Sequence, residues 1–470
     1  MDLTMEKYIL ILLIFFVIIG VIIFFIKGFI KNYIIRLNID TIEAPGKAGK
    51  VIVFAPHNDD EVLGAGGFIK RTLENGGKVK VVLMTNGDGF KAAVQFDCLN
   101  FKPNPKDYIK FAYQRQKESI SALEKLGLLE NDIVFLGYPD GGMRALWEKY
   151  WNKTKSYTSK STQSNKTPYN NSFTRVSSYC GESVVSDISK IIEEYRPIEL
   201  VYPHPNDRHP DHWTTDAFIK YTLAILNYKP KKELLYLVHR GDWPTQMKRE
   251  PNMYLVPPLK LIGTGTKWYA FDLNSDDISE KTKAIYTYRT QIKILKPLLT
   301  TFERKNELFG RYDNLKIPFS NNNSEEFITR NSNKIIIDPL KDKLNLKISK
   351  GADIYAVYIE RNEDNSLNIA GEMNDEIEEN TKYGFNIIFF NDKCVSRLNL
   401  EVKNGKMHAK EIGKQSIMNI EGVKLNIRGE KIILNIPENT IGYFSNVFIN
   451  ISTHIGHRMM DKTAWRMLDM

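Results

Sequence analysis

The chain has 470 residues, and 42% of them are hydrophobic, which is enough for more than one packed core. The formal net charge of +9 is distributed over lysine-rich stretches without the interleaved aromatic residues of a nucleic-acid groove, so we expect no nucleic-acid partner. Three cysteines lie far apart and outside any CxxC pair, which argues against a disulfide framework and against a thiolate zinc site: Cys98, Cys180 and Cys394.

The N-terminus is predicted to be a transmembrane anchor within residues 1–37. Tyr8–Ile26 carries no charge and is long enough to cross nearly all of a hydrocarbon core of about 30 Å. No small-residue cleavage site follows, which argues against a signal peptide. Only Lys7 precedes the apolar run, whereas three basic residues follow it: Lys27, Lys31 and Arg36. The sequence therefore predicts a single-pass protein of the cell membrane, with the lipid bilayer as a partner and the body on the cytoplasmic side. An extracytoplasmic body that trims surface polysaccharide stays open.

Residues 38–50 are predicted to be a linker, and residues 51–315 a catalytic unit in which short apolar runs alternate with helical patterns. The predicted strands are Val51–Ala55, Val79–Met84, Ile133–Leu136, Leu200–Tyr202 and Leu234–Val238; the predicted helices are Glu61–Asn75, Tyr108–Leu126, Glu182–Tyr195 and Asp211–Leu226, with a closing helix at Ile278–Leu299. This alternation indicates an α/β fold with a Rossmann-like, doubly wound and mostly parallel sheet. Ligands bind such sheets beyond the carboxyl ends of the strands.

Two polar clusters follow predicted strands. The first is VIVFAPHNDDEVLGAGG, in which His57 and Asp60 are three residues apart and can face one ion as half of a zinc site. The second is YPHPNDRHPDHW, which offers His204, His209 and His212 as sources of a third ligand. Three protein ligands with one open position are typical of a hydrolytic zinc site. The carboxylates of the first cluster would equally suit a plain acidic helix start.

These two clusters resemble the signatures of the PIG-L (LmbE-like) deacetylases, His-Pro-Asp-Asp-Glu and His-Pro-Asp-His. Here the first reads His57-Asn58-Asp59-Asp60-Glu61, with Asn58 in place of the proline, and the second is intact at residues 209–212. The resemblance implies one zinc ion per chain on His57, Asp60 and His212. It also implies that Asp59 is the general base, and that His209 stabilises the oxyanion as a protonated imidazole or supplies a proton to the amine. By the same resemblance, Arg115 and Asp140 would bind the substrate.

Two further segments lie outside these motifs. Residues 151–178 are rich in Ser, Thr, Asn, Lys and Tyr, which predicts a flexible insertion that shapes the cleft. Residues 325–470 contain period-two segments with hairpin signals at Asn404-Gly405 and Arg428-Gly429, which predict an all-β sandwich. Its final residues weakly resemble DOMON and family-nine carbohydrate-binding modules. Glycan contact is one reading of this domain, and a structural lid or partner surface is the other.

The predicted function is zinc-dependent hydrolysis of the N-acetyl group of a GlcNAc-containing glycoconjugate or polysaccharide, an N-acetylated amino sugar, with release of acetate and a free amine. Two alternatives remain open. One is a membrane-tethered glycan-binding protein without turnover. The other is a zinc amidase that acts on a different acylated amine.

Overall fold

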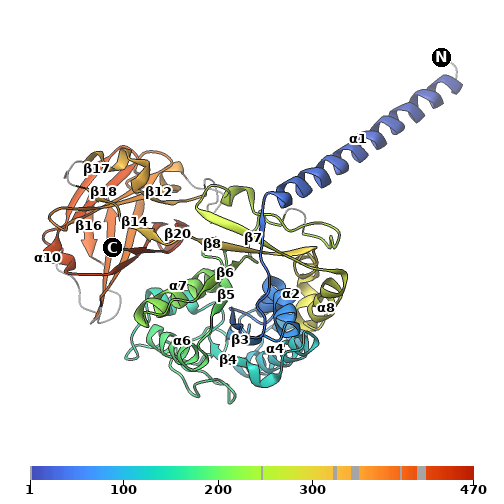
Figure 1. Cartoon of the computed structure of the whole chain (residues 1–470), viewed down its shortest axis with the longest axis horizontal. Coiled ribbons are helices and arrows are strands. Elements are labelled where there is room, and N and C mark those ends of the chain that lie inside the picture. Colours follow the sequence, from blue (N-terminus) through green and yellow to red (C-terminus); the bar gives the residue numbers. More distant parts are fainter. Residues whose placement is uncertain (1–2, 245–246, 321–324, 340–348, 392–393, 410–419) are drawn as a thin grey trace.

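The computed structural model describes residues 3–244, 247–320, 325–339, 349–391, 394–409 and 420–470, without the side chains of residues 3–7, 9–10, 21–26, 29 and 325–326. One of the period-two segments predicted within residues 325–470, at residues 344–348, lies outside the described residues. The chain has a mixed α/β core and a C-terminal β-rich region, which lie side by side (Figure 1).

An eight-stranded sheet lies at the centre of the α/β core. Its strands, in spatial order, are β1 (Asp40–Thr41), β7 (Thr266–Asp272), β8 (Asn306–Tyr312), β6 (Lys232–Tyr236), β5 (Glu199–Pro203), β2 (Lys50–Ala55), β3 (Lys78–Thr85) and β4 (Ile133–Tyr138). The run from β6 to β4 is parallel, whereas β8 is antiparallel to both of its neighbours. All five strands predicted for this unit are therefore present, and β7 and β8 extend the sheet beyond them.

Helices cover both faces of this sheet because its central strands are apolar on both sides. Along β2, Val51 and Val53 pack into one cluster, and Ile52 and Phe54 pack into the other. The helices are α2 (Asp60–Glu74), α3 (Lys91–Cys98), α4 (Pro105–Lys125), α5 (Met143–Glu148), α6 (Gly181–Tyr195), α7 (Pro210–Ile225), α8 (Ser275–Ile285) and α9 (Arg289–Thr300). The single closing helix predicted at Ile278–Leu299 is two helices, because the chain turns between α8 and α9.

The order of the strands places a crevice between β2 and β5. The chain runs outward from β2 through β3 to β4, and α6 then returns it to β5 on the other side of β2. The loops after β2 and β5 leave the sheet at this reversal, where parallel sheets bind their ligands. Both polar clusters of the sequence lie in these two loops.

The β-rich region consists of two sheets around one shared core. The first sheet contains β10 (Phe319–Ser320), β11 (Lys334–Ile337), β12 (Ile354–Asn362), β13 (Leu367–Met373), β17 (Lys424–Arg428) and β18 (Lys431–Ile436). The second contains β9 (Leu315–Lys316), β14 (Thr381–Phe390), β15 (Val395–Lys403), β16 (Lys406–Ala409), β19 (Asn446–Ile455), β20 (Arg458–Lys462) and β21 (Arg466–Asp469), and a short helix, α10 (Glu438–Ile441), precedes β19.

The second sheet packs against the α/β core through an aromatic contact. Arg397 of β15 is buried, and its guanidinium carbon lies 3.5 Å from the ring centroid of Trp151 and 4.9 Å from that of Trp147. Phe448 and Trp465 belong to the same hydrophobic cluster as these two tryptophans. A cation held against aromatic faces away from water is stabilised by about 2 kcal/mol. The two parts of the chain therefore share one core at this contact.

The predicted transmembrane anchor is wrong. Helix α1 (Leu3–Leu37) extends away from the rest of the molecule (Figure 1), and its last turns contact the core through Asn32 and Arg36. A membrane span needs about 20 consecutive apolar residues, and in the part of the chain that the structure describes no helix has the length and apolar character required. Residues 9–10 and 21–26 of the predicted span lie outside the described side chains. This finding overturns the predicted single-pass topology and the membrane location with its cytoplasmic orientation, and it gives no support to the predicted contact with a lipid bilayer.

Candidate metal and catalytic site

The loop after β2 brings three buried carboxyl groups to the crevice. Asp59 has a φ of 136°, a backbone conformation that residues other than glycine rarely adopt and that costs on the order of 1–3 kcal/mol. Glu61 helps to hold it, because its carboxylate accepts the Asp59 backbone N–H at 3.0 Å and the Tyr288 hydroxyl at 2.6 Å. Asn58, at the position where the motif usually has proline, donates to Ser119 Oγ at 2.9 Å and so ties the loop to α4. The strained turn is therefore fixed from both sides.

The loop after β5 leads directly into α7. His209 is the N-cap residue of this helix, and His212 lies in its first turn, fully buried. Asp207 fixes both: one carboxylate oxygen accepts the backbone N–H of His209 at 2.9 Å, and the other lies 3.1 Å from His212 Nδ1. The second oxygen also accepts the backbone N–H groups of Val238 and His239. Asp207 therefore joins the carboxyl ends of β5 and β6.

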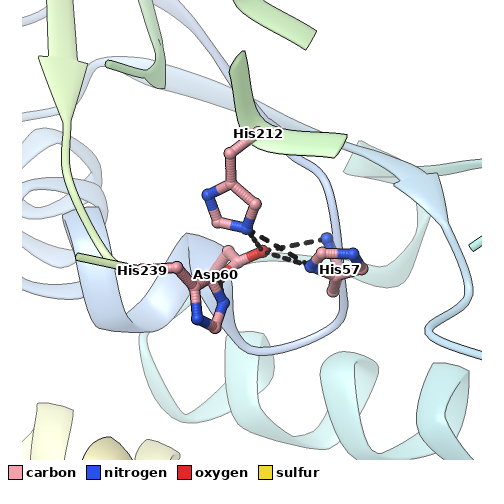
Figure 2. A group of neighbouring side chains, drawn as sticks. All are labelled: His57, Asp60, His212 and His239. Atoms are coloured by element: carbon pink, nitrogen blue, oxygen red, sulfur yellow. Dashed lines mark hydrogen bonds and ion pairs between the residues drawn. The ribbon is translucent and has the colours of Figure 1, made fainter. Parts of the chain in front are cut away.

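Three predicted metal ligands converge at one point (Figure 2). His57 Nδ1 and His212 Nε2 lie 3.0 Å and 2.9 Å from the same oxygen of Asp60, and 3.3 Å from each other. Asp60 and His212 have no exposed surface, and His57 is 7% exposed. The other oxygen of Asp60 has no hydrogen-bond partner among the described residues. These side chains form a candidate metal site.

The proton positions that the neighbours impose explain why these groups face one another. His57 Nε2 lies 3.2 Å from Asp140 Oδ1 and 3.3 Å from Asp211 Oδ2, so its proton belongs on Nε2 and its Nδ1 lone pair is free. In the same way, Asp207 places the proton of His212 on Nδ1 and frees Nε2. Two imidazole lone pairs and one carboxylate oxygen thus point at a single place, which favours a bound cation.

The pKa values of His212 and Asp60 also show that these histidines and carboxylates attract one another. Burial alone would lower the pKa of His212, but Asp207 and Asp60 raise it to about 9. Burial would likewise raise the pKa of Asp60, yet the attraction of His212 and the hydrogen bonds of its neighbours hold that pKa well below the usual range. A site that attracts a proton this strongly also attracts a metal ion, which competes for the same lone pairs.

Asp59 lies beside this site without joining it. Burial raises its pKa to about 8, and Arg115 opposes the rise with Nη2 3.4 Å from Asp59 Oδ2. Arg115 is buried in α4, and it also donates to the backbone carbonyls of Asn58 and Gly87. A divalent cation nearby would draw the pKa of Asp59 downward, because added positive charge favours the carboxylate.

Gly87 is expected to be irreplaceable because of this arginine. Its φ is +60°, and a Cβ built on it would lie 1.6 Å from Arg115 Nη1. Gly87→Ala should therefore displace the guanidinium from Asp59 and lower kcat at least about tenfold, measured as acetate release from an N-acetylated sugar. Gly263→Ala is the matched control, since Gly263 also has a positive φ (+83°) but no atom within 4 Å of the added Cβ. Equal losses in both variants would mean that backbone strain, and not the collision with Arg115, is responsible.

His209 is held as a neutral ring that donates into the crevice. Its Nδ1 accepts the backbone N–H of Asp211 at 3.2 Å, so the one proton of the neutral ring is on Nε2. Burial and the neighbouring histidines keep its pKa well below the ordinary value. His209 is thus a hydrogen-bond donor without a positive charge, which differs from the protonated imidazole that the family resemblance allows.

A pocket of about 520 Å³ opens beside these groups. Its polar lining includes His57, Asp59, Arg115, Asp140, His209 and His239, and its apolar lining includes Leu63, Phe90 and three leucines of α9, Leu295, Leu298 and Leu299. Tyr157, Lys160 and Ser161 of the 151–178 insertion complete the wall. All seven predicted site residues therefore come together, five at the pocket surface and two, Asp60 and His212, directly behind it.

Two residues at this site, Asp211 and His239, were not among the predicted site residues. Asp211 accepts the backbone N–H groups of Gly141 and Met143 and contacts His57 Nε2, so it orients a predicted ligand. The sequence feature that could have identified Asp211 is its position inside the second motif, between His209 and His212. His239 follows β6, and its Nε2 lies 3.7 Å from Asp60 Oδ1. His204 is elsewhere: it is buried and stacked on Trp268 with a centroid distance of 5.2 Å.

Comparison with known proteins identifies a family whose model matches part of this chain. Residues 52–222 match the family described as PIG-L: GlcNAc-PI de-N-acetylase. A search of curated proteins found no match. Similar solved structures include the N,N'-diacetylchitobiose deacetylase from Pyrococcus horikoshii, with 21% identity, 56% of this chain and 82% of that chain covered, and a TM-score of 0.35. They also include a deacetylase of teicoplanin biosynthesis, with 16% identity, 56% and 97% covered, and a TM-score of 0.37. A conserved protein from Thermus thermophilus has 18% identity, 54% and 84% covered, and a TM-score of 0.33.

The family match covers both motif-bearing loops, and those loops meet at the candidate metal site. Residues 52–222 therefore form a PIG-L family domain, and the chain is a hydrolase with N-deacetylase activity.

Proposed function

We propose that the chain uses one zinc ion to remove the acetyl group from an N-acetylated amino sugar, in a GlcNAc-containing glycoconjugate or polysaccharide. The observation that carries this proposal is the convergence of two imidazole lone pairs and one carboxylate oxygen beside a pocket that also contains Asp59. The family match supplies the reaction class.

The donor set fits zinc in type and in spacing. Zinc takes nitrogen and carboxylate ligands at about 2.0–2.1 Å in tetrahedral sites, which places neighbouring ligand atoms about 3.3 Å apart. His57 Nδ1, Asp60 Oδ2 and His212 Nε2 are separated by 3.0, 2.9 and 3.3 Å. His57, Asp60 and His212 would hold the ion, which leaves a fourth position for the reaction. When bound there, zinc acts as a Lewis acid on the amide carbonyl and makes water more acidic.

Asp59 would act as the general base. Its carboxylate lines the pocket next to the ligands, and Arg115 fixes its orientation. Asp59 takes a proton from the attacking water while the water oxygen forms a bond to the acetyl carbon. The proton then passes from Asp59 to the sugar nitrogen as the C–N bond breaks, so that acetate and a free amine are released.

His209 would stabilise the charge that develops on the carbonyl oxygen. Its Nε2–H is free because its Nδ1 is engaged by the Asp211 backbone, and the ring lies at the pocket surface with its centroid 4.6 Å from that of His57. A fixed donor of this kind typically contributes about 3–4 kcal/mol to catalysis. Neutral His209 can supply this hydrogen bond throughout the reaction without a change of protonation.

Arg115 and Asp140 would serve the substrate mainly by positioning. Both line the pocket, as predicted for substrate-binding residues. Their polar atoms, however, already contact other residues of the site. Arg115 pairs with the carboxylate of Asp59, whereas Asp140 contacts the His57 ring and accepts the Gly89 backbone N–H. We infer that substrate selection lies more with the insertion, which contributes Tyr157, Lys160 and Ser161.

The proposal is tested by acetate release. Purified protein is stripped with a chelator, reloaded with zinc, and incubated with a panel of N-acetylated sugars. We expect no acetate from the stripped protein, and restored release from a GlcNAc derivative after one equivalent of zinc. Undiminished activity in stripped protein would refute the metal, and release only from acylated amines that are not sugars would refute the substrate class.

A further inference from the structure

The two parts of the chain enclose a second hollow, a groove of about 330 Å³ that is rich in basic residues. Six cations line it: Lys220, Lys229, Lys231, Lys232, Arg311 and Arg466. The groove lies at the opposite end of α7 and β6 from the metal site. His212 is in the first turn of α7, whereas Leu223 and Ala224 of its last turn line the groove, and a helix of 16 residues is about 24 Å long.

The carboxylates of the groove are already engaged. Glu233 accepts the Tyr202 hydroxyl, Asp469 accepts the Asn446 side-chain amide, and Asp313 pairs with Lys267 at 2.8 Å. None of the three pairs with a groove cation in the described part of the chain. Positive charge therefore remains uncompensated along the groove.

Four of the cations have no carboxylate within 4 Å among the described residues: Lys229, Lys231, Arg311 and Arg466. Arg466 is the most informative, because it is only 5% exposed and yet lines the groove. Its guanidinium carbon lies 3.9 Å from the ring centroid of Tyr312, and no side chain of the described residues accepts a hydrogen bond from it. The two carboxylates that attract it, Asp216 and Asp313, are each paired with a lysine at 2.8 Å.

Because Arg466 lines the groove and no side chain of the described residues accepts a hydrogen bond from it, its guanidinium can pair with an anion that enters the groove. We propose that this interdomain groove binds an anionic polysaccharide through its phosphate or carboxylate groups. A single phosphate would leave most of the four unpaired cations unused, so a chain with several charges fits better. Nucleic acid fits less well, because two of the groove tyrosines offer no free ring face to a base: Arg466 covers the ring of Tyr312, and Tyr202 is fully buried. The site is separate from the deacetylase centre and does not depend on its chemistry.

The test uses the full chain and isothermal titration with four probes: polygalacturonate, a phosphodiester-linked glycan polymer, inorganic phosphate, and a single-stranded oligonucleotide. We expect one or both glycan polymers to bind, more tightly than phosphate or the oligonucleotide, and to weaken as sodium chloride is raised. The tighter of the two polymers identifies the anionic group. No polymer binding at low salt, or tighter binding of the oligonucleotide, would overturn the proposal.

Variants locate the site. Arg466→Gln should weaken polymer binding about tenfold or more. Because Arg466 is buried, the more exposed pair Lys231→Gln and Arg311→Gln provides an independent measurement with the same expected direction. Lys283→Gln, an exposed lysine of α8 outside the groove, is the control. Zinc content and acetate release from a small substrate should not change in any of these variants, so a failure here is distinct from a failure of the proposed function. Equal binding by the control and by all groove variants would place the polymer elsewhere.

Discussion

Asp59→Asn is expected to lower kcat about 10²- to 10⁴-fold while the protein keeps its metal. Asparagine has the same shape as aspartate but cannot take a proton from water. Asp59 is not one of the three converging donors, so the metal site should remain intact. The measurements are kcat from acetate release and metal content by elemental analysis of the same sample.

Glu61→Gln is the matched control for Asp59→Asn. It also replaces a buried carboxyl group of this loop by an amide. The amide oxygen can still accept from the Asp59 backbone N–H, and the amide NH2 group can donate to the Tyr288 hydroxyl oxygen. We expect a much smaller loss of kcat in this variant. Comparable losses in both would assign the effect to the charge of the loop and not to a base at position 59, and loss of metal from Asp59→Asn would make Asp59 a ligand.

His212→Ala should remove the metal and, with it, the activity. The substitution deletes one of three donors to the metal. Removing a residue that only hydrogen-bonds to a ligand typically lowers metal affinity 10- to 100-fold, and removing the ligand itself costs more. We therefore expect zinc affinity to fall by more than about a hundredfold, measured by competition with a chromogenic chelator.

Two further variants separate ligands from their supports. His239→Ala should keep zinc within about tenfold of the parent affinity, because His239 Nε2 faces the oxygen of Asp60 that the other two imidazoles do not share. Asp207→Asn should weaken zinc about 10- to 100-fold, since Asp207 orients His212 without contacting the ion. Zinc loss in His239→Ala as large as that in His212→Ala would show a four-ligand site.

The core of the site was predictable because of the sheet. His57 and His212 are 155 residues apart, but His57 directly follows β2, His212 lies in the first turn of the helix that follows β5, and β2 and β5 are neighbours. Polar side chains at the carboxyl ends of adjacent parallel strands must lie close together. The periodicity of the strands and the two motifs therefore sufficed to predict that these three candidate ligands lie close together.

The supporting contacts could not be predicted in the same way. Asp140 pairs with His57, and Arg115 with the Asn58 carbonyl and Asp59, only because β4 and α4 fold beside the loop after β2. Nothing in the local sequence around either residue specifies that partner. The antiparallel strand β8 was missed for a similar reason, since its pairing with β6 and β7 joins segments far apart in the chain.

The N-terminal prediction failed because it relied on composition alone. An uncharged run of the right length suggested a membrane span, and no described helix meets the requirement for one. The β-rich region was anticipated from period-two segments and from turns at Gly405 and Gly429, which do have positive φ values. Its binding of glycans stays a prediction.

The position of Arg397 limits how the protein can be divided. A fragment that ends before β9 would expose the indole faces of Trp147 and Trp151 to solvent. These faces lie at the start of the 151–178 insertion, which lines the deacetylase pocket. The complementary fragment would carry Phe448 and Trp465 on an uncovered surface, together with a guanidinium that has lost its stacking partners. Exposed aromatic patches of this kind promote self-association. The α/β core and the β-rich region should therefore be produced, crystallised and assayed together.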